Sequence, residues 1–70
     1  MSEVEILVVG LGYIGLPTAA LLASKNFKVL GFDINNVVVD TINKGKIHIA
    51  EKDLEKIVKK SVDRGCLSAS

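Results

Sequence analysis

Apolar residues in the first half of the chain form two short runs on either side of a longer helical one. Residues 4–9 are apolar at nearly every position from Ile6 on, which is typical of a parallel strand that is buried on both faces. Residues 12–24 predict a helix with apolar side chains almost all round it, and such a helix is normally buried on more than one side. A second strand is predicted at residues 28–32. The pattern therefore predicts an α/β fold with parallel strands.

The second half of the chain predicts two further helices and no complete strand. A short helix is expected at residues 37–42, and residues 46–50 are expected to form a connecting loop or a short extended segment. A longer helix is predicted at residues 52–63, because its apolar residues share one face and its lysines lie opposite. Residues 67–70 then lead toward a strand that we expect to lie outside this sequence. The predicted element order is β-α-β-α-α.

Three glycines stand between the first strand and the first helix with the spacing G-x-G-x-x-G. In a strand–turn–helix context this spacing is typical of a turn that binds the pyrophosphate of a dinucleotide. Gly10 allows a tight turn, Gly12 lets the phosphates approach the backbone, and Gly15 lets the helix pack close to the strand. Unpaired N–H groups and the dipole at the helix start attract the anion. The alternative is a glycine-rich turn in another kind of α/β domain. The residues expected to line the pyrophosphate are Gly10, Leu11, Gly12, Tyr13, Ile14 and Gly15.

Asp33 follows the second strand, 18 positions after Gly15. This is close to the spacing of about 20 residues expected for the acid that binds the adenosine ribose. A 2′-phosphate would meet a like charge and no nearby arginine, so the sequence favours NAD over NADP. The alternative role for Asp33 is the N-cap of the next helix, although Asn35 or Asn36 could also fill that role.

The length of the chain bears on the size of the fold. A complete Rossmann domain contains two βαβαβ halves and needs roughly twice the 70 residues present here. We therefore expect a partial Rossmann-like NAD(P)-binding fold, in which residues 1–70 form the N-terminal part, with the rest of the domain and a substrate domain absent. The first helix supports this, because its second apolar side needs a cover that the sequence does not obviously supply. Uncovered sheet edges would favour self-association, so we expect a homo-oligomer as one state of the chain.

Composition and charge exclude several classes of protein. The hydrophobic fraction of 49% is too high for a disordered chain. A formal net charge of +1 gives no electrostatic argument for nucleic-acid binding. No apolar run approaches the roughly 20 residues of a membrane span. Acidic residues, Glu3 and Glu5, stand where a signal peptide would be basic, so we expect a cytoplasmic location.

His48 and Cys66 are the remaining candidates for chemistry. His48 lies in an alternating Ile-His-Ile segment, which indicates a side chain facing solvent; the alternative is a loop contact to substrate or cofactor. Cys66 lies in no recognisable motif, so we interpret it as incidental. One histidine and one cysteine provide no cluster of metal ligands, and we expect no metal.

The segment Gly-Leu-Gly-Tyr-Ile-Gly-Leu-Pro at residues 10–17 resembles the N-terminus of nucleotide-sugar dehydrogenases of the UDP-glucose and UDP-N-acetylmannosamine type. Residues 29–35 resemble the second strand of that family with its ribose aspartate, and residues 45–54 resemble the loop that leads into its next helix. The Ile-His-Ile portion leans toward the UDP-N-acetylmannosamine members. The usual Glu-Pro pair of this loop reads Glu51-Lys52 here. The resemblance covers essentially all 70 residues, but only the N-terminal portion of the family.

The resemblance implies an enzyme of polysaccharide biosynthesis that oxidises the C6 alcohol of a UDP-sugar, either UDP-N-acetylmannosamine or UDP-glucose, to the uronate with two NAD. It also implies that the nucleophilic cysteine, which forms a thiohemiacetal, lies far downstream in the family. Cys66 does not match that cysteine, so we expect cofactor-binding residues and no catalytic residues in this chain. The alternative function is a nucleotide-binding regulatory or sensor module without hydride chemistry.

Overall fold

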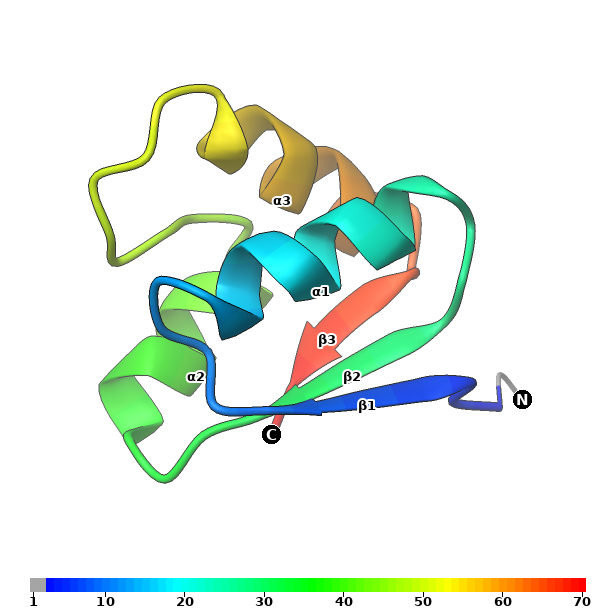
Figure 1. Cartoon of the computed structure of the whole chain (residues 1–70), viewed down its shortest axis with the longest axis horizontal. Coiled ribbons are helices and arrows are strands. Elements are labelled where there is room, and N and C mark those ends of the chain that lie inside the picture. Colours follow the sequence, from blue (N-terminus) through cyan, green and yellow to red (C-terminus); the bar gives the residue numbers. More distant parts are fainter. Residues whose placement is uncertain (1–2) are drawn as a thin grey trace.

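Strands and helices alternate along most of the chain in the computed structural model, which describes residues 3–70 (Figure 1). In chain order the elements are β1 (Ile6–Val9), α1 (Gly15–Ser24), β2 (Val29–Phe32), α2 (Asn36–Asn43), α3 (Leu54–Asp63) and β3 (Leu67–Ala69). Within the described residues the strands form one parallel sheet in the order β1-β2-β3. The register pairs Ile6 with Val29 and Val29 with Leu67. The predicted α/β fold with parallel strands is confirmed.

The strand β3 corrects the prediction that residues 67–70 only lead toward a missing strand. It pairs with β2 from Leu67 to Ala69. Beyond it, the Ser70 N–H donates to the Gly31 carbonyl oxygen at 2.9 Å, and the Asp33 N–H donates to the Ser70 carbonyl oxygen at 3.2 Å. The element order is therefore β-α-β-α-α-β. Three residues are too few to show a recognisable alternation of apolar and polar positions in the sequence. This strand is identified by its pairing with β2.

The outer side of α1 is covered by α3, which also corrects the sequence analysis. Figure 1 shows the two helices side by side above the same face of the sheet, and they are in contact. Ala19, Ala20 and Ala23 of α1 are fully buried, as is Val58 of α3. Small alanine side chains let the backbone of α1 approach both the sheet and the second helix. The residues after the predicted loop therefore supply the cover that the apolar first helix needs.

The sheet is covered on one face only within residues 3–70. On the face beneath the helices, the side chain of Val29 is 2% exposed and that of Leu67 is 3% exposed. On the other face, Leu7 is 58% exposed, Val9 71% and Phe32 43%. The sequence predicts strands buried on both faces, whereas in the described part of the chain β1 is half-buried on one face and open on the other.

The bounds of the helices differ from the predicted ones by one to three residues. The first helix begins at Gly15 rather than at residue 12, so residues 12–14 belong to the preceding turn. Pro17 consequently falls in the first turn, where a missing N–H costs little. Asn26 (φ 74°) follows α1 and Gly45 (φ +76°) follows α2, both in the left-handed conformation expected at helix ends.

Two asparagines fix α2 at its ends. The Asn35 side chain caps its start by accepting the Val37 N–H at 2.9 Å. At its other end, Asn43 pairs with the backbone of Ala69 through both atoms of its amide group. Its Nδ2 donates to the Ala69 carbonyl oxygen at 2.9 Å, and its Oδ1 accepts the Ala69 N–H at 2.8 Å. The amide of Asn43 thus takes the place of a further strand at the outer edge of β3.

Candidate dinucleotide-binding site

The glycine turn, which we define as residues 10–15, lies at the carboxyl end of β1, the edge of a parallel sheet at which α/β proteins bind ligands. The Gly10 N–H donates to the Phe32 carbonyl oxygen at 2.7 Å, which extends the pairing of β1 with β2 by one residue. Gly10 then adopts φ +89°. L-residues with a Cβ rarely adopt this conformation, so the chain can leave the strand abruptly here because the residue is glycine.

Gly15 lies where α1 packs against the turn. A Cβ at this position would overlap the carbonyl oxygen of Gly10 and would lie 3.6 Å from Val8 Cγ1. Because the nearest atom belongs to the backbone, a side chain could be accommodated only by moving the helix away from β1. This is the close helix–strand packing that the sequence predicts for Gly15.

Gly12 differs from Gly15 because it faces open space. No heavy atom of residues 3–70 beyond its chain neighbours lies within 4 Å of the position that a Cβ would take. It lines an open groove of about 590 Å³ together with exposed Tyr13 and Ile14. The N-terminus of α1 opens onto this groove, and no acidic residue stands in the first turn of that helix. The partial positive charge of the helix end is therefore free to attract an anion.

Asp33 connects the glycine turn to the start of α2. Its Oδ2 accepts the Leu11 N–H at 2.9 Å, and its Oδ1 accepts the Asn35 N–H at 2.9 Å. These two backbone hydrogen bonds, of which that from Leu11 has the larger effect, lower the pKa of Asp33 below its usual value and outweigh the opposing effect of desolvation. The carboxylate is therefore ionised at neutral pH, and each oxygen keeps a lone pair for a further donor.

The structure shows that Asp33 does not have the N-cap role that was considered for it. The N-cap of α2 is Asn35, and Asp33 instead accepts the backbone N–H of that cap residue. Beside Asp33 is a hollow of about 130 Å³ with largely apolar walls, and Ile34 at its rim is 91% exposed. The apolar residues of this hollow were not predicted from the sequence, although each lies at a strand end or beside the aspartate. They are Val9, Phe32 and Ile34.

The two remaining candidates lie in different surroundings. His48 is exposed in the loop between α2 and α3. Cys66 is buried, and its carbonyl accepts the Val29 N–H at the amino end of β2, opposite to the end that carries Asp33. Within residues 3–70 no three His, Cys, Asp or Glu side chains gather in a way that could hold a metal ion. Over the same residues, none of the helices has the length and apolarity needed to span a bilayer.

Comparison with known proteins decides between the kinds of nucleotide-binding domain. Residues 4–70 match the model of the UDP-glucose/GDP-mannose dehydrogenase family, NAD-binding domain. The chain belongs to this dehydrogenase family. The part of the family that it matches is the NAD-binding domain, which confirms the cofactor predicted from the sequence.

Individual members of the UDP-glucose/GDP-mannose dehydrogenase family are similar over most of the chain. The UDP-N-acetyl-D-mannosamine dehydrogenase of Escherichia coli (strain K12) is 59% identical over 70 residues, which is 100% of this chain and 17% of that protein. The NDP-N-acetyl-D-galactosaminuronic acid dehydrogenase of Ralstonia nicotianae is 59% identical over 63 residues, 90% of this chain and 15% of that protein. The chain thus spans about one sixth of the length of these relatives.

Solved structures of the family have the same fold as this chain. A ternary complex of GDP-mannose dehydrogenase from Pseudomonas aeruginosa superposes with a TM-score of 0.91 at 35% identity, covering 93% of this chain and 15% of that one. The UDP-N-acetyl-mannosamine dehydrogenase of Staphylococcus aureus superposes with a TM-score of 0.89 at 42% identity, covering 93% and 16%. The predicted Rossmann-like fold is confirmed by these structures.

Proposed function

We propose that this chain forms the adenosine-diphosphate side of the NAD site in a nucleotide-sugar dehydrogenase of the UDP-N-acetylmannosamine type. The observation that carries the proposal is the 2.9 Å hydrogen bond from the Leu11 N–H to the Asp33 carboxylate. It holds a phosphate-binding turn and a ribose acceptor in one rigid unit, although they are 22 residues apart. High identity to UDP-N-acetyl-D-mannosamine dehydrogenase over the whole chain supports the type of substrate.

In this proposal each part of the site binds one part of the cofactor. The pyrophosphate lies along the glycine turn, where Gly12 leaves open space beside the N-terminus of α1. The Asp33 carboxylate accepts the ribose hydroxyls, and its negative charge disfavours the 2′-phosphate of NADP. When bound, NAD supplies the hydride acceptor of the reaction. The pyrophosphate-binding residues that we propose are Gly10, Leu11, Gly12, Tyr13, Ile14 and Gly15.

The finer activity is proposed for the longer protein to which a chain of this kind would belong. There we propose oxidation of the C6 alcohol of UDP-N-acetylmannosamine, or of UDP-glucose, to the uronate with two NAD, in cytoplasmic polysaccharide biosynthesis. Residues 1–70 would supply the N-terminal part of the dinucleotide-binding domain, and the catalytic residues would come from elsewhere. The relatives named above are dehydrogenases, which favours this activity over a regulatory nucleotide sensor.

Calorimetric titration of the chain with NAD and with NADP tests the proposal. We expect NAD to bind more tightly than NADP. Replacing Asp33 with Asn, which removes the charge and keeps one acceptor oxygen, should reduce that preference. Asp40→Asn is a matched control, because Asp40 is an exposed acid on α2 that lines neither the groove at the glycine turn nor the hollow beside Asp33. Equal affinity for both cofactors, or the same preference in the Asp33→Asn variant, would contradict the assigned role of Asp33.

A further inference from the structure

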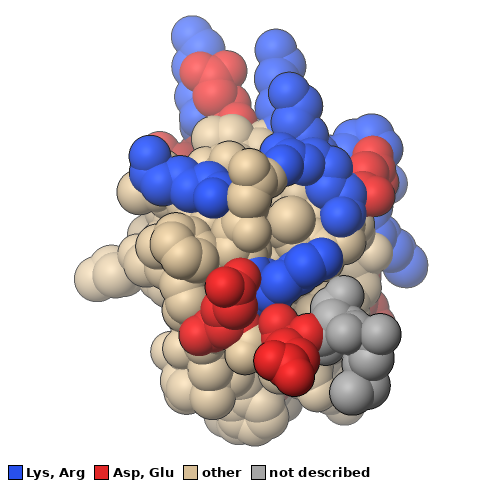
Figure 2. All heavy atoms as spheres, turned by 90° about the vertical axis from the view of Figure 1, so that its right-hand side faces the viewer, with Lys and Arg blue, Asp and Glu red and all other residues tan. Residues whose placement is uncertain are grey.

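The helix α3 presents a stripe of cations that the dinucleotide site does not use. Lys56 and Lys60 of α3 and Arg64, which directly follows the helix, are spaced at intervals of four residues, so they lie along one side of the helix over about 12 Å. All three are exposed. Figure 2 shows lysine and arginine side chains gathering on the upper part of the molecule, where Figure 1 places α3. We refer to these three residues as the basic stripe.

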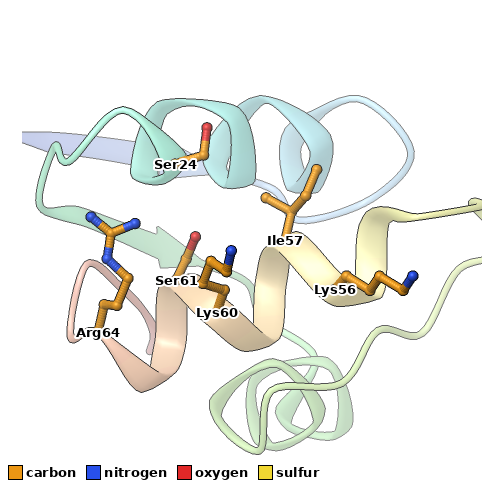
Figure 3. Close-up of a pocket in the computed structure, with 6 residues that line it drawn as sticks. All are labelled: Ser24, Lys56, Ile57, Lys60, Ser61 and Arg64. Carbon is orange, nitrogen blue, oxygen red and sulfur yellow. The ribbon is translucent and has the colours of Figure 1, made fainter.

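The basic stripe borders a groove between α3 and the last turn of α1 (Figure 3). The groove has a volume of about 310 Å³, and besides the stripe it is lined by Ser24, Ile57 and Ser61. Ile57 is 39% exposed and gives the groove a small apolar centre. None of the described residues that line the groove is acidic. The residue that α1 contributes to the groove is Ser24, at the end of the helix, whereas the glycine turn lies before its start, about 15 Å from Ser24 along the helix axis.

The cations of the stripe are not neutralised within residues 3–70. The ion pair found there joins Lys59 Nζ to Asp63 Oδ2 at 3.2 Å, on a neighbouring side of α3. The charged groups of Lys56, Lys60 and Arg64 form no ion pair with a described carboxylate. The chain as a whole carries a net charge of only +1, so the stripe is a local concentration of positive charge and does not follow from overall composition.

The stripe is also not needed to complete the end of α1. Cations near a helix C-terminus can stabilise its free carbonyl groups. Here the Ser24 hydroxyl donates to the Leu21 carbonyl oxygen at 2.6 Å. The N–H groups of the next residues donate to the carbonyl oxygens of Leu22 and Ala23 at 3.0 to 3.4 Å. These carbonyls already have partners, so the stripe remains available to an external anion.

The shape of the stripe favours one class of partner. A single phosphate needs cations that converge on one point, whereas these follow a line of about 12 Å. A nucleic acid would gain from stacking on aromatic rings, and none of the described residues that line the groove is aromatic. We propose that the groove docks an acidic helical segment of a partner protein, with carboxylates spaced i, i+4 and i+8 opposite the stripe and an apolar residue against Ile57.

The probe for this proposal is a synthetic alanine-based helix with three Glu residues at that spacing and one Leu between them. Fluorescence anisotropy would measure its binding to the chain, with the same peptide carrying Gln for Glu as the reference. We expect the Glu peptide to bind more tightly than the Gln peptide, and added salt to remove the difference. NAD should leave the affinity unchanged, because the groove and the glycine turn share no lining residue.

A triple variant, K56Q/K60Q/R64Q, should lower the affinity for the Glu peptide about tenfold, since each pair is exposed and worth a fraction of a kcal/mol to about 1 kcal/mol. The control variant K44Q/K46Q/K52Q removes the same charge at exposed positions outside the stripe, and it should keep the affinity within about twofold. Circular dichroism would confirm that both variants are folded. Equal binding of the two peptides, equal loss in the two variants, or tighter binding of duplex DNA than of the Glu peptide would overturn the proposal.

Discussion

The two faces of the sheet are alike in sequence and different in surroundings. Leu7 and Val9 of β1 are as apolar as Val29 and Leu67, yet the first two are more than half exposed and the last two are almost fully buried. The difference arises because α1 and α3 both lie over one face. Within residues 3–70 the sheet therefore gains stability from one side only. An apolar strand residue in the sequence indicates that its burial would be favourable, but it does not indicate which element of the structure covers it.

The largest expected effect contrasts two leucines on the two sides. Leu16 of α1 is 0% exposed, so Leu16→Ala should cost about 2–5 kcal/mol of unfolding free energy, because a cavity remains in the core. Leu7 is 58% exposed on the open face, and Leu7→Ala should cost less than about 1 kcal/mol. Urea denaturation measures both. Equal losses would mean that the open face is covered in solution, and sedimentation would then show whether a second copy of the chain covers it.

A second contrast separates packing from ligand binding within the glycine turn. Gly15→Ala should cost about 1–3 kcal/mol of stability, because the new methyl group would overlap the Gly10 carbonyl oxygen. Gly12→Ala should cost less than about 1 kcal/mol, because its methyl group would point into open space. The same methyl group should nevertheless weaken NAD binding in calorimetry, since it would lie where the phosphates are proposed to sit. A Gly12→Ala variant that binds NAD as tightly as the parent would argue against the groove as the phosphate site.

A third variant concerns the edge of the sheet that α2 holds. Asn43→Ala removes two hydrogen bonds to the backbone of Ala69 and should cost about 1–3 kcal/mol, because a part-buried N–H and carbonyl lose their partners. Hydrogen exchange should show faster exchange of the Ala69 amide. Asn36→Ala is the matched control, because Asn36 is exposed at the start of the same helix. Unchanged exchange at Ala69 would show that pairing with β2 alone holds β3.

The sequence was most informative where a single residue meets a fixed local requirement. The spacing of Gly10 and Gly15 and the place of Asp33 after a strand could be predicted, because each reflects the geometry of one turn or one strand end. Asn26 and Gly45 were likewise predictable as helix ends, since few residues tolerate positive φ. The predicted fold family and cofactor rest on these features.

Features that depend on distant partners could not be predicted. The strand β3 rests on its pairing with β2 and on the Asn43 side chain, neither of which leaves a periodic pattern in three residues. The packing of α3 on α1 was hidden because the alanines of α1 suggested only that some cover exists. The hydrogen bond from Leu11 to Asp33 joins a backbone N–H to a side chain, and no sequence pattern records which backbone group a carboxylate will meet.

The smallest expected effect concerns pH and the same carboxylate. Backbone hydrogen bonds from Leu11 and Asn35 lower the pKa of Asp33 in the folded chain, whereas the unfolded chain has the ordinary value of 3.8. The stabilisation from Asp33 is therefore fully present above that ordinary pKa, and it is lost as pH falls through the lower folded value. We expect the urea concentration at the unfolding midpoint to decrease when the pH is lowered below about 4. The decrease should be smaller in Asp33→Asn, because this side chain cannot titrate.

Carboxyl chemical shifts measured by NMR would show the pKa of Asp33 directly, independently of other acids that affect the denaturation midpoint. A value below 3.8 would support the pairing of the carboxylate with the glycine turn. Leu11→Pro would remove the main donor but also restrict the turn, and Asn35→Pro would remove the second donor together with the side-chain cap of α2. Both variants are therefore compared by the pKa of Asp33 and not by stability. An Asp33 pKa at or above the ordinary value would mean that the two N–H groups do not hold the carboxylate in solution. The glycine turn and Asp33 would then not be held together by the hydrogen bond on which the proposed function rests.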